Sequence, residues 1–436
     1  MRQSIASIWS GRSLNDPSAR IDRFLADRVE RLSAGLFVQR DFSAVASALV
    51  ITRGRGKFLR VKHSFGSSVE IPDALGASLR EATNDPDVSV SRITQLIDDL
   101  TGIQAQAADQ LKQQAGKYVD RLLTVSVLDP GLWTTDFDGQ RACAPLCNAT
   151  SLASRSGITV IDAFAQRDID AGGNGSPLEA IPLWLLFSDR HEKIARTNVA
   201  FVSCDRQTDY FRLPASDGLD SDLPALEHTI LPGTAFLIEA LERVLATRLT
   251  ENDVKQLYSD HLVDDELSLR LKSAWLDGGR SEFEKVACSY INNVNADASV
   301  AGKLLCTTIE WICKHIARTI RAGAKATGGA RQQVLLSSCD VIEACLLNRL
   351  AREFDSGDVF SKEDAGFKGL KLNAVVAAIL GMMNVDQFPA NVPWLTGASS
   401  QRILGRLTPG NPSNWRQLLR DMADFQPPAM KLRDAI

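Results

Sequence analysis

Three aspartates and a glycine-rich loop stand close together between residues 158 and 178. Asp162, Asp168 and Asp170 are carboxylates, and Arg167 is the one cationic residue among them. Carboxylates can act as general acids or bases, and glycines let backbone N–H groups approach a polar or anionic ligand closely. The glycines of this loop are Gly172, Gly173 and Gly175.

The elements on either side of the loop would place it at the edge of a sheet. Residues 158–161 are β-branched and predict a buried strand, and Pro177 precedes an apolar segment that predicts a helix. In α/β proteins a ligand commonly binds where the carboxyl end of a strand meets such a loop. The same pattern also fits a surface turn with solvated carboxylates, and the stretch alone leaves both interpretations open.

Composition indicates a globular protein with more than one domain. The chain has 436 residues, of which 44% are hydrophobic and 23% charged, and its formal net charge is −4. This charge gives no domain-wide basic field, so nucleic acid is not an expected partner. The longest apolar run, Ala180 to Phe187, is too short to span a bilayer and contains Pro182, so no membrane segment is expected.

The amino terminus and the cysteines predict a cytoplasmic location. Residues 1–20 contain no apolar stretch long enough for a signal peptide. The eight cysteines are scattered along the chain, which suits a reducing compartment. Cys143 and Cys147 form the closest pair, but no histidine stands nearby, so their spacing predicts no metal site.

Hydrophobic periodicity alternates between helix and strand along the chain. Apolar residues at helical spacing predict helices over 21–32, 72–82, 91–111, 151–156, 234–245, 300–320 and 374–382, and again after residue 410. Apolar and β-branched runs predict strands over 42–52, 58–65, 122–128, 158–161, 198–204, 209–213 and 333–337. This alternation is typical of an α/β protein.

A polar segment near the middle of the chain predicts two lobes. Residues 215–226 are rich in Asp, Ser, Gly and Pro, which is typical of a boundary. Shortly after it, Pro232 and Gly233 precede an apolar helical pattern, and Thr234 stands where a helix cap is expected. The expected parts are an N-terminal extension with a helix (1–34), a first lobe (35–225), a second, more helical lobe (226–410) and a C-terminal helical tail (411–436).

From Gly35 to Gly410 the chain resembles the anhydro-N-acetylmuramic acid kinase family. The likeness is strongest in AGGNGSPL, residues 171–178, where the family has AGGQGAPL. It is equally clear in FPANVPWLTGASSQRILGRLTPG, residues 388–410, which is close to the family's NLPSVTGA…VLG…P ending. Pro232 and Gly233 resemble the centre of the family's DTGPGN loop.

This resemblance implies a fold and a chemistry. The family has a two-lobed actin-like, sugar-kinase fold of the ribonuclease H-like type, with a central cleft. Its members use Mg-ATP and water to open the 1,6-anhydro ring of an amino sugar and phosphorylate the sugar during cell-wall recycling. The resemblance also implies a homodimer, and the apolar helical face of the C-terminal tail is the surface we expect to be left over for it.

The chain departs from the family at the segments that hold ATP there. The family's first turn reads GLMSGTSLDGVDAALV, whereas residues 35–50 read GLFVQRDFSAVASALV. The family's NIGGIAN and CGGG turns correspond to residues 203–209 and 337–340, which contain no glycine. Glycine loops hold phosphates through backbone N–H groups, so these replacements imply weak binding of Mg-ATP or none.

The family's catalytic base also lacks a counterpart. The family's ADFR motif puts the base on Asp, and this position is Ala163 here, one residue after Asp162. The family's HGQT turn is replaced by LDPG, residues 128–131, and a family glutamate expected to touch the sugar falls on Asn373. A general base must reach the attacking water, and on a strand Asp162 would point to the opposite face from position 163.

Three functions therefore remain open. The first is a non-catalytic relative that binds a cell-wall sugar or a partner, or acts as a scaffold. The second is an active amino-sugar kinase in which Asp162 or Asp168 has become the base. The third is an enzyme that works without ATP, such as a hydrolase acting through Asp168 and Asp170. The residues expected to contact a ligand are Arg167, Gly172, Gly173, Gly175, Pro232, Gly233 and Thr234.

Overall fold

The computed structural model describes residues 30–84, 88–135, 141–188, 198–205, 207–215, 225–259, 262–292, 298–326, 332–338, 341–354, 358–367 and 371–423. The chain forms two compact units. One, here called the inserted unit, consists of residues 187–366. The other, the discontinuous unit, combines the described residues of 30–186 with those of 367–423.

The discontinuous unit is built on a six-stranded mixed sheet in the order β13-β7-β4-β1-β2-β3. β1, β2 and β3 form an antiparallel meander, β4 is parallel to β1, β7 is parallel to β4, and β13 closes the edge antiparallel to β7. A separate hairpin joins β5 to β6. The strands are β1 (Arg31–Val38), β2 (Ala44–Arg53), β3 (Arg60–Glu70), β4 (Leu122–Leu128), β5 (Leu132–Thr135), β6 (Arg141–Ala144), β7 (Thr159–Asp162) and β13 (Arg406–Thr408).

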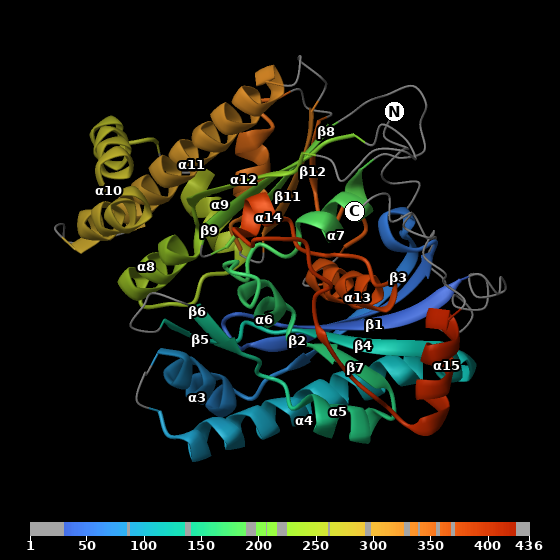
Figure 1. Cartoon of the computed structure of the whole chain (residues 1–436). Helices are drawn as coiled ribbons and strands as arrows, with labels where there is room; N and C mark the ends of the chain where they lie inside the picture. The colour runs from blue at the N-terminus through green and yellow to red at the C-terminus, as the bar shows by residue number, and fades with distance from the viewer. Residues whose placement is uncertain are drawn as a thin grey trace. The chain divides into compact units, whose positions relative to one another are not determined.

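Helices cover both faces of this sheet, with α13 on one face and α4 and α5 on the other (Figure 1). A Cβ at Gly35 of β1 would lie 1.9 Å from the carbonyl oxygen of Ala374, so glycine is required for the close approach of α13. The helices are η1 (Gly56–Phe58), α3 (Asp73–Asn84), α4 (Val90–Ala115), η2 (Gly116–Arg121), α5 (Ala149–Ser156), α6 (Phe164–Ile169), α7 (Ala180–Phe187), α13 (Lys371–Val385), α14 (Pro393–Thr396) and α15 (Pro412–Ala423).

The inserted unit repeats the same strand order in a five-stranded sheet, β10-β9-β8-β11-β12. Here too the first three strands form an antiparallel meander, and the next two run parallel to the first. Its elements are β8 (Asn198–Cys204), β9 (Gln207–Leu213), β10 (Glu227–Pro232), α8 (Ala235–Leu245), α9 (Glu251–Ser259), α10 (Asp265–Asn292, kinked at Gly279), α11 (Ala298–Ala326), β11 (Gln332–Ser338), α12 (Glu343–Leu350) and β12 (Val359–Ser361).

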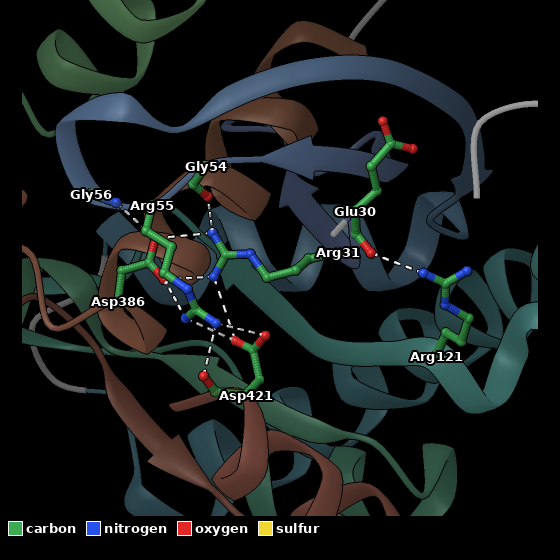
Figure 2. Close-up of polar contacts among 8 residues, drawn as sticks. All are labelled: Glu30, Arg31, Gly54, Arg55, Gly56, Arg121, Asp386 and Asp421. Carbon is green, nitrogen blue, oxygen red and sulfur yellow. Dashed lines mark hydrogen bonds and ion pairs between the residues drawn. The ribbon is translucent and has the colours of Figure 1, made fainter. Parts of the chain in front are cut away.

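In the discontinuous unit, a largely buried charge network joins α15, the last helix among the described residues, to the end of α13 (Figure 2). Asp386, at the end of α13, is fully buried and accepts hydrogen bonds from Arg31 and from the backbone N–H of Gly56. Arg55 bridges Asp386 at 3.2 Å and Asp421 of α15 at 3.0 Å. Because the two arginines balance the two aspartates, the buried charges are paired rather than isolated.

The expected α/β class is confirmed, and most predicted elements lie within a few residues of the observed ones. One helix prediction is wrong at its end. Residues 1–29 lie outside the described residues, but Arg31 and Leu32, placed in a helix over 21–32, belong to β1. β1 is buried on both faces, between α13 and α4, so its apolar run lacks the polar–apolar alternation of a half-exposed strand.

The compact units divide at residues 186/187 and 366/367, away from the expected boundaries at 225/226 and 410/411. The reason lies in α13, which packs on β1, β2 and β4 and so returns the chain to the discontinuous unit after residue 366. The tail also differs from expectation, because Leu418 of α15 is buried and α15 packs against β4. In the described residues no helix is long and apolar enough to cross a membrane.

Candidate functional site

The buried side chain of Asp168 holds the glycine loop in place through hydrogen bonds. It lies on α6 and is fully buried. Its Oδ2 accepts a hydrogen bond from the backbone N–H of Gly175 at 2.9 Å. Its Oδ1 accepts two more, from Asn391 Nδ2 and Thr396 Oγ1, each at 2.8 Å. A Cβ at Gly173 would lie 2.2 Å from Asp168 Oδ2, so this glycine is required for the loop to close over the carboxylate.

Further contacts join the same loop to the segment after α13. The backbone N–H of Asn174 donates to the carbonyl of Thr396 at 2.7 Å, and the N–H of Ser399 donates to the carbonyl of Ala171 at 2.8 Å. The two stretches that most resemble the kinase family, 171–178 and 388–410, therefore meet in one place. The loop is partly exposed at Gly172, Asn174 and Ser176, and Arg167 of α6 is exposed as well.

Asp162 ends β7 and is paired with a cation. Arg406, its cross-strand neighbour on β13, donates from Nε to Oδ1 at 3.1 Å and from Nη2 to Oδ2 at 2.6 Å. Burial raises the pKa of Asp162, and the bonds and charge of Arg406 oppose that rise. A bidentate pair of this kind occupies both oxygens of the carboxylate.

A small pocket lies in the same unit, at the carboxyl ends of the parallel strands β4 and β7. Ala163 lines it in a left-handed conformation (φ 58°) at the start of α6, so the strand has already ended at this residue. The wall is completed by Val127, Leu128, Asp129, Cys143, Pro145, Phe164, Ala165 and Gln166. Neither Asp162 nor Asp168 is among the residues that line it.

Asp129 is the acidic residue of this pocket, and sequence analysis did not single it out. Its Oδ1 accepts hydrogen bonds from the backbone N–H groups of Gly131 and Leu146, both at 2.9 Å. Burial raises its pKa to about 6, against the lowering effect of those two bonds, and the negative charge of Asp162 adds to the rise. An aspartate directly after the buried strand 122–128 was the available sequence signal.

The second set of expected ligand residues, Pro232, Gly233 and Thr234, lies in the inserted unit and is buried. Thr234 occupies the N-cap position of α8, as expected, but its side chain makes no capping hydrogen bond. The carbonyl oxygen of Asp205 accepts from the backbone N–H groups of Thr234 and Ala235, at 2.8 and 3.2 Å. These amides at the start of α8 are therefore bonded within the protein.

The turn between β1 and β2 corresponds to the first turn of the kinase family and is closed by its own groups. The N–H of Gln39 donates to the carbonyl of Ala44, the N–H of Phe42 to the carbonyl of Gln39, and the N–H of Ser43 to Asp41 Oδ1. Phe42 is buried at a positive φ of 55°. Of the other replaced segments, residues 206, 339 and 340 lie outside the described residues.

No group of three or more His, Cys, Asp or Glu side chains that could hold a metal ion occurs within the described ranges. Burial raises the pKa values of Cys143, which lines the pocket, and of Cys147, that of Cys143 to about 12.

Comparison with known proteins identifies similar sequences. The family model described as anhydro-N-acetylmuramic acid kinase matches residues 41–204 and 272–410. The protein with that name from Caldanaerobacter subterraneus subsp. tengcongensis is 22% identical over 411 residues, which cover 89% of this chain and all of the relative. Those from Chromobacterium violaceum and Synechococcus elongatus are 26% and 25% identical, covering 78% and 58% of this chain and 90% and 67% of the relatives.

Solved structures that match are more distant. A ROK family glucokinase from Streptomyces griseus aligns with a TM-score of 0.34 and 12% identity, covering 80% of this chain and 98% of the glucokinase. The xylulose kinase from Rhodospirillum rubrum aligns with a TM-score of 0.35 and 11% identity, covering 90% and 98% of the two chains.

Proposed function

We propose that this chain, which belongs to the anhydro-N-acetylmuramic acid kinase family, binds an amino sugar without phosphorylating it. The observation that carries the proposal is the closed turn between β1 and β2. Phosphates are held by backbone N–H groups of open glycine loops. Here the N–H groups of Gln39, Phe42 and Ser43 are bonded inside the turn, and the Phe42 side chain is buried in the hydrophobic core of the unit. These residues do not fit the phosphates of Mg-ATP.

The state of the acidic residues supports the same proposal. Ala163 provides no base at the family's position. Arg406 engages both oxygens of Asp162, and Gly175, Asn391 and Thr396 engage those of Asp168. Hydrogen bonds and a paired cation stabilise the charged form of a carboxylate, which makes either residue a weaker general base.

Calorimetry and an activity assay together test this function. We expect binding heat when 1,6-anhydro-N-acetylmuramic acid is added to the protein, and no heat when Mg-ATP is added. We expect no release of ADP when both are present. The alternative, an active amino-sugar kinase using Asp162 or Asp168, would give turnover near ~1 s⁻¹ that the Asp162→Asn or the Asp168→Asn variant abolishes. The expected place of action is the cytoplasm.

We also propose that the protein forms a homodimer, through α10 rather than through the tail. Leu269 and Leu276, seven residues apart on α10, are 67% and 73% exposed, and Leu262 just before the helix is 83% exposed. Two copies of α10 paired antiparallel about Leu269 would bring Glu266 opposite Lys272 of the partner subunit, because each lies three residues from Leu269. Apolar residues at heptad spacing with flanking opposite charges are typical of a helix-pair interface.

Light scattering of two matched variants tests the dimer. Leu269→Glu is expected to give the mass of one chain. Leu419→Glu, at an exposed leucine of α15, is expected to keep the mass of two. A wild-type mass of one chain would contradict the dimer, and loss of the dimer in Leu419→Glu alone would move the interface to the tail.

A further inference from the structure

We propose that the hairpin of β5 and β6 is a pH-sensitive switch, which leaves the glycine loop by local opening when Asp129 loses its proton. The main sheet of the discontinuous unit stays folded during this opening. The inference concerns access to the glycine loop and holds whether or not the protein binds an amino sugar. It follows from the contacts of Asp129, from the exposure of the hairpin and from the space around the carboxyl group.

The first step is that Asp129 joins the two ends of the hairpin. Its Oδ1 accepts a hydrogen bond from the backbone N–H of Gly131, just before β5, and another from that of Leu146, just after β6, both at 2.9 Å. One oxygen atom therefore closes the base of the hairpin. Any movement that separates β5 and β6 from the unit must break or shift these two bonds.

The second step is that the hairpin has little buried surface of its own. β5 and β6 form a two-stranded sheet that is separate from both larger sheets. Of the side chains in these two strands that the structure describes, only Leu132 and Cys143 are half-buried, and the others are exposed. A two-stranded hairpin is marginally stable in water, and segments with few buried apolar contacts open locally. The hairpin can therefore open while the main sheet stays intact.

The third step identifies what the opening uncovers. β6 lies beside α6 (Figure 1), where Gln166 Nε2 donates to the carbonyl of Cys143 at 2.8 Å. The indole of Trp133 on β5 is 43% exposed, and its Nε1 donates to the carbonyl of Pro130 at 2.6 Å. A Cβ at Gly175 would lie 2.8 Å from this ring, so the indole covers one side of the glycine loop. Opening of the hairpin uncovers that side.

The fourth step is the shortage of space for water around the carboxyl group. The pocket that Asp129 lines has a volume of about 20 Å³, which is room for about one water molecule. An ionised carboxylate has about four acceptor sites, and in the closed hairpin two N–H groups and one water molecule cannot fill them all. In the open hairpin water can reach the whole group. The charged form of Asp129 therefore favours the open hairpin, and the neutral form favours the closed one.

The fifth step concerns the charges near Asp129, which set the pH of the change. Among the described residues, the titratable groups that face it are Asp162 with its cation Arg406, and the thiols of Cys143 and Cys147. Burial raises the pKa values of both thiols, so they stay neutral up to pH 8. Burial also raises the pKa of Asp129 to about 6, the charge of Asp162 adds to the rise, and the two backbone bonds oppose it. The closed hairpin thus binds the proton more tightly than the open one, and opening becomes easier as pH rises from about 4 to 6.

The test is hydrogen exchange of the full chain at pH 5 and pH 8, measured by mass spectrometry. Each exchange rate is divided by the intrinsic rate at the same pH, which gives a protection factor. In the wild type we expect the protection of β5 and β6 to fall about tenfold from pH 5 to pH 8, since the pKa of Asp129 is about 6 in the closed form and 3.8 when solvated. At both pH values the amides of β4 should be roughly a hundredfold better protected than the hairpin, because they exchange only when the main sheet unfolds.

Three variants complete the experiment. Asp129→Asn is neutral at both pH values and keeps an oxygen for the two N–H groups, so its hairpin protection should not change with pH and should exceed that of the wild type at least about tenfold at pH 8. Trp133→Ala removes the ring contact, so protection should fall at both pH values while the pH dependence remains. Asp109→Asn makes the same chemical change at an exposed site of α4 and should match the wild type.

Three results would overturn the proposal. Equal protection of the hairpin and β4 would show that the hairpin opens only when the whole unit unfolds. The same fall from pH 5 to pH 8 in Asp129→Asn as in the wild type would remove the role of Asp129. A hairpin that is less protected in Asp129→Asn than in the wild type at pH 8 would show that the charged carboxylate closes the hairpin rather than opening it.

Discussion

The two units share one strand order but hold their loops in different ways. In the discontinuous unit a buried side chain, Asp168, bonds the glycine loop to the segment after α13. In the inserted unit a main-chain carbonyl, that of Asp205, bonds the start of α8. A side-chain bond requires a particular residue at one end at least, whereas a main-chain bond accepts almost any residue.

The family model leaves out one part of the inserted unit. The family model matches 41–204 and 272–410, and the unmatched stretch 205–271 contains β9, β10, α8 and α9 of the inserted unit. The retained stretches 171–178 and 388–410 are the partners of Asp168. Their retention is therefore accounted for by packing within one unit and does not by itself require that the family's chemistry be kept.

The largest effect should come from a substitution at Asp168, and the same substitution at Asp205 should have almost none. Asp168→Ala leaves Gly175 N–H, Asn391 and Thr396 without their buried acceptor, and we expect a loss of about 3–5 kcal/mol in the free energy of unfolding. Asp205→Ala keeps its carbonyl, and we expect a loss under ~0.5 kcal/mol. Denaturant titration measures both. Equal losses would remove the contrast between the units.

A smaller effect is expected at the ion pair of the same unit. Arg406→Ala leaves Asp162 buried without its cation and should cost about 2–4 kcal/mol near pH 7, discounted because Arg406 is more than half exposed. Removal of the cation raises the pKa of Asp162 further. An acid with a raised folded-state pKa loses stability as pH rises, so the deficit should shrink from pH 8 to pH 5. A deficit independent of pH would show that lost packing, not charge, is responsible.

The smallest effect is expected at Asp129, where substitution should raise the free energy of unfolding rather than lower it. Its folded-state pKa of about 6 lies above the value of 3.8 for a solvated aspartate, so the charged form costs stability, and that cost develops between about pH 4 and pH 6. Asp129→Asn should therefore be more stable than the wild type by about 1–2 kcal/mol at pH 8 and equal to it at pH 4. Thermal unfolding across this range checks the sign, and a destabilised variant at pH 8 would contradict it.

Sequence patterns predicted elements well where periodicity is local, as in strand 122–128 and helix 300–320. They failed at β1, whose doubly buried run has no alternation. They identified Asp162 and Asp168 as acidic residues beside a glycine loop but gave no sign of their partners, because Arg406 and Thr396 lie more than 200 residues away along the chain. Asp129 was missed because comparison with the family's motifs searched for residues that this chain has lost. The carboxylate of Asp129 is instead a group that the family's HGQT turn does not contain.

The position of α13 has a consequence for how the protein is made. β1 and β4 need α13 to cover one face, and α13 is translated only after the whole inserted unit, residues 187–366. At ~5–20 residues per second a ribosome needs roughly 10–40 s to synthesise that unit. During this interval the nascent sheet exposes the surface around Gly35 that later receives α13, and the inserted unit can fold before the older unit is complete. A nascent chain of this protein therefore presents an unfinished apolar sheet to chaperones while it is still attached to the ribosome.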